Sequence, residues 1–347
     1  MLKKKKELFI ALATTFLALL LGLILIEGYY WKSGYTSLVC EICQFHPQLG
    51  WETIPGKTVT NGKITYTTNS MGMRSGEVDS SRRHILLVGD SVTFGLGVNN
   101  DETASHYLDK EQLEYQVLNL GVPGYGIGQY YLNLKRHIDK LNPKLIVLIL
   151  YTANDLEETR KETRYGISKP FFIYQNGGLL HLNPNISRFS CSNLYARLRF
   201  TKHLIPKFLI DNCQARVIER DKASPTITKL IDEIRILGMQ RNIPTLMVLS
   251  PALTAVKAVT CKQSQPLEAC ADYDPGFEGF YRFFQKIMEL YKLPYVDFLQ
   301  YLLDYDKDEE TIRSLYRNSG KDIHHYSPQG NALLAQAIAE RLTLGNQ

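Results

Sequence analysis

Residues 84–91 read HILLVGDS, a short apolar run that ends at a glycine and is followed at once by an acid and a serine. Such a run, bounded by glycine, is typical of a strand buried on both faces of a parallel sheet. Similar runs stand at 115–120 (YQVLNL), 144–150 (KLIVLIL) and 244–250 (PTLMVLS), and a shorter one at 295–298 (YVDF). These five runs predict the strands of one buried sheet.

Helical stretches separate the predicted strands. Ser224 and Ser327 each stand before a proline, an order that suits an N-cap followed by the first helical residue. Strands that alternate with helices predict an α/β fold, here a three-layer αβα sandwich around a central parallel sheet. The helices are expected at 102–113, 128–141, 225–238, 276–291 and 328–342.

The N-terminus carries a candidate membrane anchor. Residues 8–26 hold no charge, and as a helix they span about 28 Å, close to the thickness of a bilayer core. Lysines precede this run at 3–6 and aromatic residues follow it at 29–31, which predicts a cytoplasmic N-terminus and a main domain that is periplasmic or extracellular. A cleaved signal peptide is the alternative. Its apolar region is shorter and ends at a small-residue cleavage site, so we expect a retained single-pass helix.

Composition narrows the range of partners. The net charge of +5 comes largely from lysines 3–6, so the rest of the chain is nearly balanced and nucleic acid is not an expected partner. The 6 cysteines suggest disulfides if the main domain lies in an oxidising compartment. A redox or metal role for the CEIC spacing at 40–43 is not expected. The sequence leaves the pairing open, with Cys191–Cys213 and Cys261–Cys270 favoured as local pairs.

The chain is predicted to have three parts. Residues 1–31 hold the lysines and the anchor, 32–83 form a lead-in segment with a strand at 63–68, and 84–345 form the main α/β domain. An insertion at about 157–223 is far longer than a usual connection between a strand and a helix. It is either a lid over a site or a surface subdomain, and both interpretations stay open.

Polar residues follow the predicted strands at the edge where parallel sheets bind ligands. Ser91 comes directly after the first strand, loop 119–126 (NLGVPGYG) after the second and 151–155 (YTAND) after the third. A serine at such a turn suits a nucleophile, and glycine-rich loops and asparagine amides suit an oxyanion. Near the C-terminus, 322–330 (DIHHYSPQG) places an aspartate three residues before a histidine, so that the acid can orient the imidazole. Each motif alone also suits a tight turn or a helix cap.

Together and in this order, the four blocks resemble the SGNH, or GDSL-type, hydrolase superfamily, and in particular its bacterial membrane-anchored members. The resemblance implies a flavodoxin-like three-layer fold and a catalytic triad, with Ser91 as nucleophile, His325 as base and Asp322 as orienting acid. It also implies an oxyanion hole made by the N–H groups of Ser91 and Gly124 and the side-chain amide of Asn154. No metal and no cofactor is expected.

The resemblance covers about 84–155 and 225–342 and has two departures. Thr152 stands where the third block usually has glycine, a change that bears on the local backbone and not on the following asparagine. Val92 replaces the usual leucine of the first block. The lead-in also resembles the segment before the first block in membrane-anchored members, and no role is assigned to it. Its two matching stretches are 46–51 (HPQLGW) and 69–74 (NSMGMR).

We therefore expect a serine esterase that hydrolyses a carboxylic ester on a small molecule or an acylated glycan, for example an acetylated envelope polysaccharide. His324 competes with His325 for the role of base, and the spacing from Asp322 favours His325. An O-acyltransferase would use the same acyl-enzyme, and a lipase or thioesterase would need a long apolar groove. A non-catalytic glycan-binding protein that kept the fold is the alternative from another class. The oligomeric state stays open.

Overall fold

A parallel sheet forms the centre of the molecule, seen here in a computed structural model that describes residues 2–32, 41–112, 114–164, 167–186, 216–264, 275–306, 308–320 and 322–344. The sheet has five strands in the order β13-β12-β7-β5-β6, and every pairing is parallel. All five lie where the apolar runs predicted them, which confirms the α/β class. They are β5 (Arg83–Val88), β6 (Tyr115–Asn119), β7 (Leu145–Tyr151), β12 (Thr245–Ser250) and β13 (Tyr295–Asp297).

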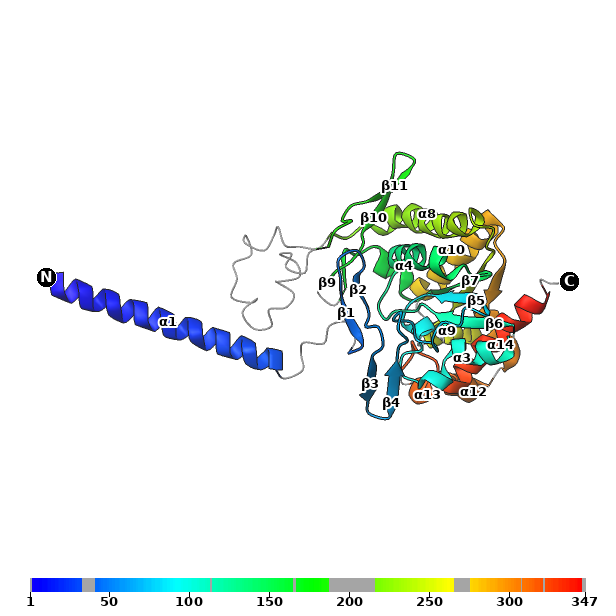
Figure 1. Cartoon of the computed structure of the whole chain (residues 1–347), viewed down its shortest axis with the longest axis horizontal. Coiled ribbons are helices and arrows are strands. Elements are labelled where there is room, and N and C mark those ends of the chain that lie inside the picture. Colours follow the sequence, from blue (N-terminus) through cyan, green and yellow to red (C-terminus); the bar gives the residue numbers. More distant parts are fainter. Residues whose placement is uncertain are drawn as a thin grey trace.

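Helices cover both faces of the sheet (Figure 1). On one side α4 (Ile127–Leu141) packs against α8 (Arg220–Met239), and on the other α3 (Ala104–Glu111) packs against α14 (Pro328–Leu344). Because both faces are covered, residues 147–150 of β7 are fully buried, which accounts for the unbroken apolar sequence of this central strand. Further helices are α2 (Ser91–Phe94), η1 (Asn100–Glu102), α5 (Asp155–Thr159), α9 (Leu253–Ser264), α10 (Pro275–Tyr291), α11 (Phe298–Tyr305), α12 (Glu309–Ser314) and α13 (Arg317–Gly320).

The two predicted serine caps have different outcomes. Ser327 caps α14, because its hydroxyl accepts a hydrogen bond from the backbone N–H of Gly330 at 3.2 Å. The prediction at Ser224 is wrong, since α8 begins at Arg220 and encloses Pro225. The backbone N–H of Ala223 donates to Glu219 at 2.9 Å, and the Ala223 side chain is buried in the core. Tertiary burial therefore extends the helix upstream of the position that the proline suggested.

The lead-in segment forms two small hairpins beside the sheet. They are β1 (Cys43–His46) with β2 (Gly50–Thr53), and β3 (Thr58–Asn61) with β4 (Ile64–Thr67). The second confirms the strand predicted at 63–68. Cys43 is disulfide-bonded. Of the favoured local pairs, Cys191, Cys213, Cys270 and the side chain of Cys261 lie outside the described residues.

The insertion is described at both of its ends, whereas residues 187–215 lie outside the described ranges. Its strands pair as β8 (Thr163–Arg164) with β9 (Ile167–Ser168) and as β10 (Phe172–Gln175) with β11 (Gly178–His181). The β10–β11 hairpin rests on α8, where the N–H of Tyr174 donates to the Thr226 hydroxyl at 2.9 Å. Figure 1 shows this hairpin projecting at the top of the molecule, away from the sheet.

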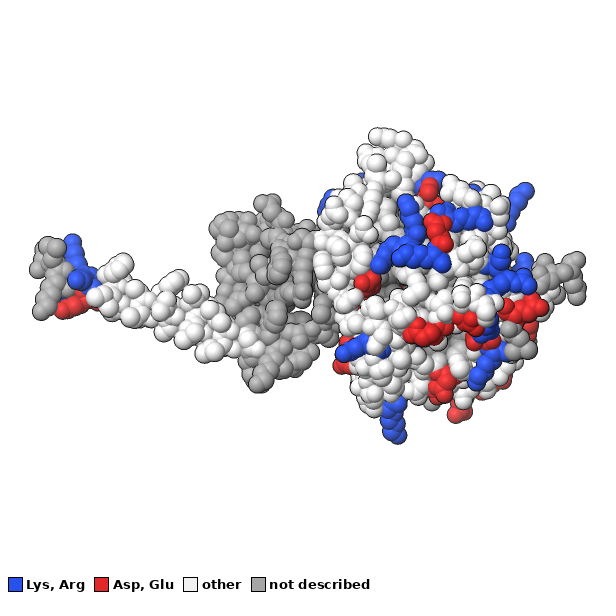
Figure 2. Space-filling model, in the orientation of Figure 1, with Lys and Arg blue, Asp and Glu red and all other residues white. Residues whose placement is uncertain are grey.

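The N-terminal helix α1 (Leu2–Lys32) contains a stretch, Lys4–Ile26, that is long and apolar enough to cross a membrane, and none of that stretch is buried in the protein. Figure 1 shows α1 extending away from the α/β domain. The side chains of the aromatic residues at 29–31 lie outside the described residues. On the face of the domain shown in Figure 2, cationic and anionic side chains are interspersed.

Candidate active site

Ser91 occupies the strand-to-helix turn at the carboxyl end of β5. It is the first residue of the short helix α2, whose N-cap is Asp90, and the Asp90 carboxylate accepts the N–H of Val92 at 2.9 Å. The chain leaves β5 toward β6 on one side and later returns to β7 on the other. In open α/β sheets this is the point where a crevice forms at the strand ends. The local fold thus presents the Ser91 hydroxyl at the mouth of such a crevice.

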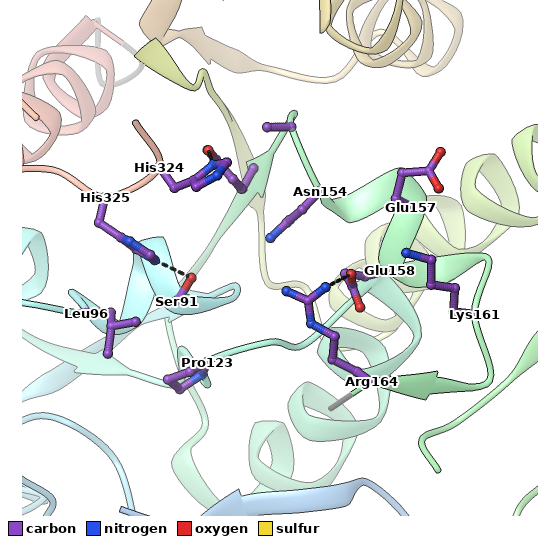
Figure 3. Close-up of a pocket in the computed structure, with 12 residues that line it drawn as sticks. Ser91, Leu96, Pro123, Asn154, Glu157, Glu158, Lys161, Arg164, His324 and His325 are labelled. Atoms are coloured by element: carbon purple, nitrogen blue, oxygen red, sulfur yellow. Dashed lines mark hydrogen bonds and ion pairs between the residues drawn. The ribbon is translucent and has the colours of Figure 1, made fainter. Parts of the chain in front are cut away.

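His325 lies against Ser91 although 234 residues separate them. Its Nε2 is 2.9 Å from the Ser91 hydroxyl, and its Nδ1 is 3.0 Å from Oδ2 of Asp322. With the carboxylate beside Nδ1, the proton of a neutral ring belongs on Nδ1, so Nε2 is the acceptor for the serine hydroxyl. Figure 3 shows the imidazole directed at Ser91. This is the hydrogen-bonded order that the resemblance implies for these three side chains.

Asp322 is surrounded by donors. Besides His325, it accepts the Arg317 guanidinium at 2.9 Å and the backbone N–H groups of His324 and His325 at 3.1 and 3.2 Å. Burial by itself raises the pKa of Asp322, but the hydrogen bond and charge of His325, with the donors from His324 and Arg317, outweigh it and hold this pKa well below its usual range. The Asp322 carboxylate is therefore ionised at neutral pH, and as an anion it can orient the imidazole of His325.

His324 lines the same cavity but points elsewhere. Its Nδ1 lies 2.7 Å from the hydroxyl of Tyr151, and burial lowers the pKa of its imidazole. Tyr151 ends the central strand β7, so a rigid element holds this ring away from the serine. The structure places His325, and not His324, within hydrogen-bonding distance of Ser91.

Asn154 lies just before α5, in the short turn that follows β7. It occupies the N-cap position, but within the described part of the chain its side chain makes no capping hydrogen bond. Instead its amide Nδ2 donates to Oδ2 of Asp90 at 3.1 Å, and the residue lines the cavity beside Ser91. Burial raises the pKa of Asp90, and hydrogen bonds from Val92 and Asn154 partly offset this effect. Since an amide nitrogen carries two hydrogens, one remains for a ligand in the cavity.

The loop with Gly124 lies against the serine helix. Gly124 has a φ of 77°, a left-handed conformation that favours glycine, and Pro123 just before it lines the cavity. At Gly121 an added Cβ would lie 2.3 Å from the backbone nitrogen of Phe94 in α2, so only glycine lets the two backbones approach this closely. The structure thus brings Gly124 to the same edge of the sheet as Ser91 and Asn154.

Thr152, the departure in the third block, is accommodated without strain. Its backbone is not left-handed, and both its N–H and its hydroxyl bond to the carbonyl of Ser250 on the neighbouring strand, at 3.0 and 3.2 Å. A side chain at this position therefore ties β7 to β12 and leaves Asn154 in place.

The cavity next to Ser91 measures about 360 Å³ and has two kinds of wall. Leu96 and Pro123 form an apolar side close to the serine, whereas the opposite side carries charged residues of segment 157–164 (Figure 3). Arg164 is paired with Glu158 there, and Glu157 is paired with Arg160 at 2.8 Å. The charged lining residues are Glu157, Glu158, Lys161 and Arg164. Sequence reasoning placed this segment in the insertion but did not identify its carboxylates and lysine as cavity lining.

No family model matches this chain, and no curated protein matches it. Solved structures do resemble it, each at low identity. An acetyl xylan esterase is 15% identical with a TM-score of 0.42, covering 74% of this chain and 98% of its own. A G-D-S-L family lipolytic protein from Veillonella parvula is 12% identical with a TM-score of 0.43, covering 74% and 97%. The psychrotrophic esterase EstA from Pseudoalteromonas is 11% identical with a TM-score of 0.42, covering 75% and 97%.

Proposed function

We propose that this protein is a serine hydrolase of SGNH type that cleaves carboxylic esters, with Ser91 as nucleophile, His325 as base and Asp322 as the orienting acid. The observation that carries the proposal is the chain of hydrogen bonds from the Ser91 hydroxyl through His325 to Asp322, with contacts of 2.9 and 3.0 Å. Nucleophile, base and orienting group within such distances are what acyl transfer by a serine requires.

The reaction runs in two halves. His325 takes the Ser91 proton as the hydroxyl oxygen attacks the ester carbonyl, and Asp322 stabilises the imidazolium that forms. The carbonyl oxygen becomes an oxyanion, held by the N–H groups of Ser91 and Gly124 and by the second amide hydrogen of Asn154. His325 then protonates the leaving alcohol, and the acyl group stays on Ser91. Water, activated by the same imidazole, releases the acid and restores the serine.

The lining of the cavity favours a substrate with a short acyl group on a polar carrier. Its apolar side, next to Ser91, has room for a small acyl chain, and its opposite side presents charged groups that suit hydroxyl-rich carriers such as glycans. Within this cavity, a long acyl chain would lie against Glu157, Lys161 and Arg164. Contact with the chain would remove water from these charged groups, which costs free energy. We therefore propose an acylated glycan, such as an acetylated envelope polysaccharide, as the substrate class.

The roles are tested by alanine variants and a chromogenic ester. Ser91→Ala and His325→Ala should each lower kcat toward p-nitrophenyl acetate by roughly 10⁴-fold or more, because either one disables proton transfer and attack. His324→Ala is the matched control, since its ring lines the same cavity but bonds to Tyr151, and it should change kcat by less than about tenfold. Wild-type rates in Ser91→Ala would refute the nucleophile, and a reversed order of the two histidines would exchange their roles.

A further inference from the structure

We propose that the lead-in segment completes the active site, with Trp51 as a positioning residue that holds the peptide between Pro123 and Gly124. The inference rests on the proposed function, because it concerns the N–H of Gly124 as an oxyanion donor. It gives a role to the HPQLGW stretch at 46–51, which the proposed triad does not use.

Residues 122–125 form a β-turn around this peptide. The N–H of Tyr125 donates to the carbonyl of Val122 at 3.2 Å, and Gly124 has a φ of 77°. Proline at the second position and a positive-φ glycine at the third define a type II turn. A type I turn of the same four residues differs mainly by a half rotation of the central peptide, which reverses the Pro123 carbonyl and the Gly124 N–H together. Pro-Gly fits both forms and favours type II, so a contact that holds this peptide strengthens a preference that the turn sequence already has.

Trp51 holds the central peptide in the type II orientation. Its side chain is fully buried, and its indole N–H donates to the Pro123 carbonyl at 3.0 Å. In a trans peptide the carbonyl and the N–H point in opposite directions. The bond that draws the Pro123 carbonyl toward Trp51 therefore turns the Gly124 N–H the other way. Rotation of the peptide would break this buried hydrogen bond, which is costly.

Two further buried hydrogen bonds attach the β1–β2 hairpin to this loop and to the first turn of α4, without touching that peptide. The Tyr125 hydroxyl donates to the Trp51 carbonyl at 2.6 Å, and the Gln129 amide donates to the Leu49 carbonyl at 2.8 Å. The rings of Trp51 and Tyr125 also meet edge-to-face, with centroids 5.8 Å apart. Several contacts thus dock the hairpin. Of these four contacts, the hydrogen bond from the Trp51 indole N–H is the one made to the Pro123–Gly124 peptide.

This division of contacts provides a matched pair of variants in the full-length chain. Trp51→Phe removes the indole N–H and keeps an aromatic ring, and it should lower kcat toward p-nitrophenyl acetate by roughly 10- to 100-fold with KM within about twofold. Tyr125→Phe removes one buried hydrogen bond of the same cluster and should leave kcat within about threefold. Thermal unfolding of both variants checks that the losses of stability are comparable. Phosphonylation of Ser91 by a fluorophosphonate should slow in parallel with kcat.

The outcomes separate this inference from the proposed function. If Ser91→Ala abolishes hydrolysis but Trp51→Phe retains wild-type kcat, or if Tyr125→Phe loses as much kcat as Trp51→Phe, the positioning role is wrong and the hydrolase stands. If wild-type protein neither hydrolyses esters nor reacts with the fluorophosphonate, both fail. Should Trp51→Phe not fold, 3-benzothienylalanine at position 51 keeps the shape of the ring system and lacks only the N–H, and the same kcat criteria apply.

Discussion

At the scale of a single side chain, the hydrogen bonds of Asp322 lead to a specific prediction. It is held by Arg317 and faces Nδ1 of His325, so it dictates which imidazole nitrogen carries the proton. Asp322→Asn keeps the size of the side chain but offers an amide to Nδ1, which favours the wrong tautomer. We expect kcat to fall by roughly 10³- to 10⁴-fold with little change in KM. Steady-state kinetics on a soluble ester would show this, and a loss confined to KM would contradict it.

The same residue links stability to pH. Its pKa in the folded protein is held below that of the unfolded chain, so the folded state binds fewer protons and the stabilisation is present in full above the unfolded pKa of about 4. It is lost as pH falls from there through the folded pKa. The difference in unfolding free energy between wild type and Asp322→Asn should therefore shrink as pH drops below about 4. Urea unfolding across this range measures it, and a constant difference would contradict the assignment.

Among the elements, the short helix α2 depends on the lead-in for its far end. Arg74 lies over the rings of Tyr66 and Phe94, 4.7 Å from each centroid, and its guanidinium donates to the carbonyls of Phe94 and Val98 at 2.8 and 2.6 Å. Burial lowers the pKa of Arg74 to about 10, so the group is still charged at neutral pH. A buried cation thus closes the C-terminal end of α2, where it also complements the helix dipole.

Arg74→Met should destabilise the fold by roughly 3 kcal/mol, because it leaves buried carbonyls of the 94–98 loop without donors. The matched control is Arg83→Met. Arg83 also stacks on an aromatic ring, that of Tyr115 at 5.3 Å, but its side chain is 56% exposed, so the change should cost less than about 0.5 kcal/mol. Denaturant unfolding of the two variants makes the comparison. Equal stability losses would show that Arg74 does not act through the buried loop.

For the whole molecule, we expect helix α1 to serve membrane attachment and the docked lead-in to serve activity. The large apolar side chains of α1 are exposed, for example Phe9 at 72%, and soluble proteins rarely leave so long an apolar surface open. A bilayer would bury it, and lysines 3–6 favour a cytoplasmic N-terminus. We propose that the α/β domain lies on the opposite side, in the periplasm or outside the cell.

Truncation tests this arrangement. Deleting residues 1–32 should move the protein from the membrane to the soluble fraction and leave kcat toward a soluble ester unchanged, because α1 extends away from the α/β domain (Figure 1). Deleting residues 1–80 should instead remove most activity, since Trp51 and Arg74 are lost with the lead-in. Fractionation and kinetics on the two truncations decide the matter. A fully active 81–347 protein would show that the lead-in only tethers the domain.

The sequence was sufficient for the strands of the sheet, and it also named the candidate site residues, whose roles stay a prediction. A strand covered on both faces is apolar along nearly its whole length, so the strands at 84–88 and 144–150 can be recognised from the local sequence. The chemistry at the ends of those strands is also local, since each motif lies within a few residues of a strand or a helix start. The start of α8 was misplaced, because the proline is a local signal that burial of Ala223 overrides.

The tertiary structure alone decided which groups meet. Spacing from Asp322 favoured His325, but it is the bond between His324 and Tyr151 that holds the second ring away from Ser91. The contact of Trp51 with Pro123 spans 72 residues and leaves no pattern in either segment. Periodicity reports only whether a residue is buried, whereas the partner of a buried donor depends on the order of strands in the sheet and on how distant loops dock.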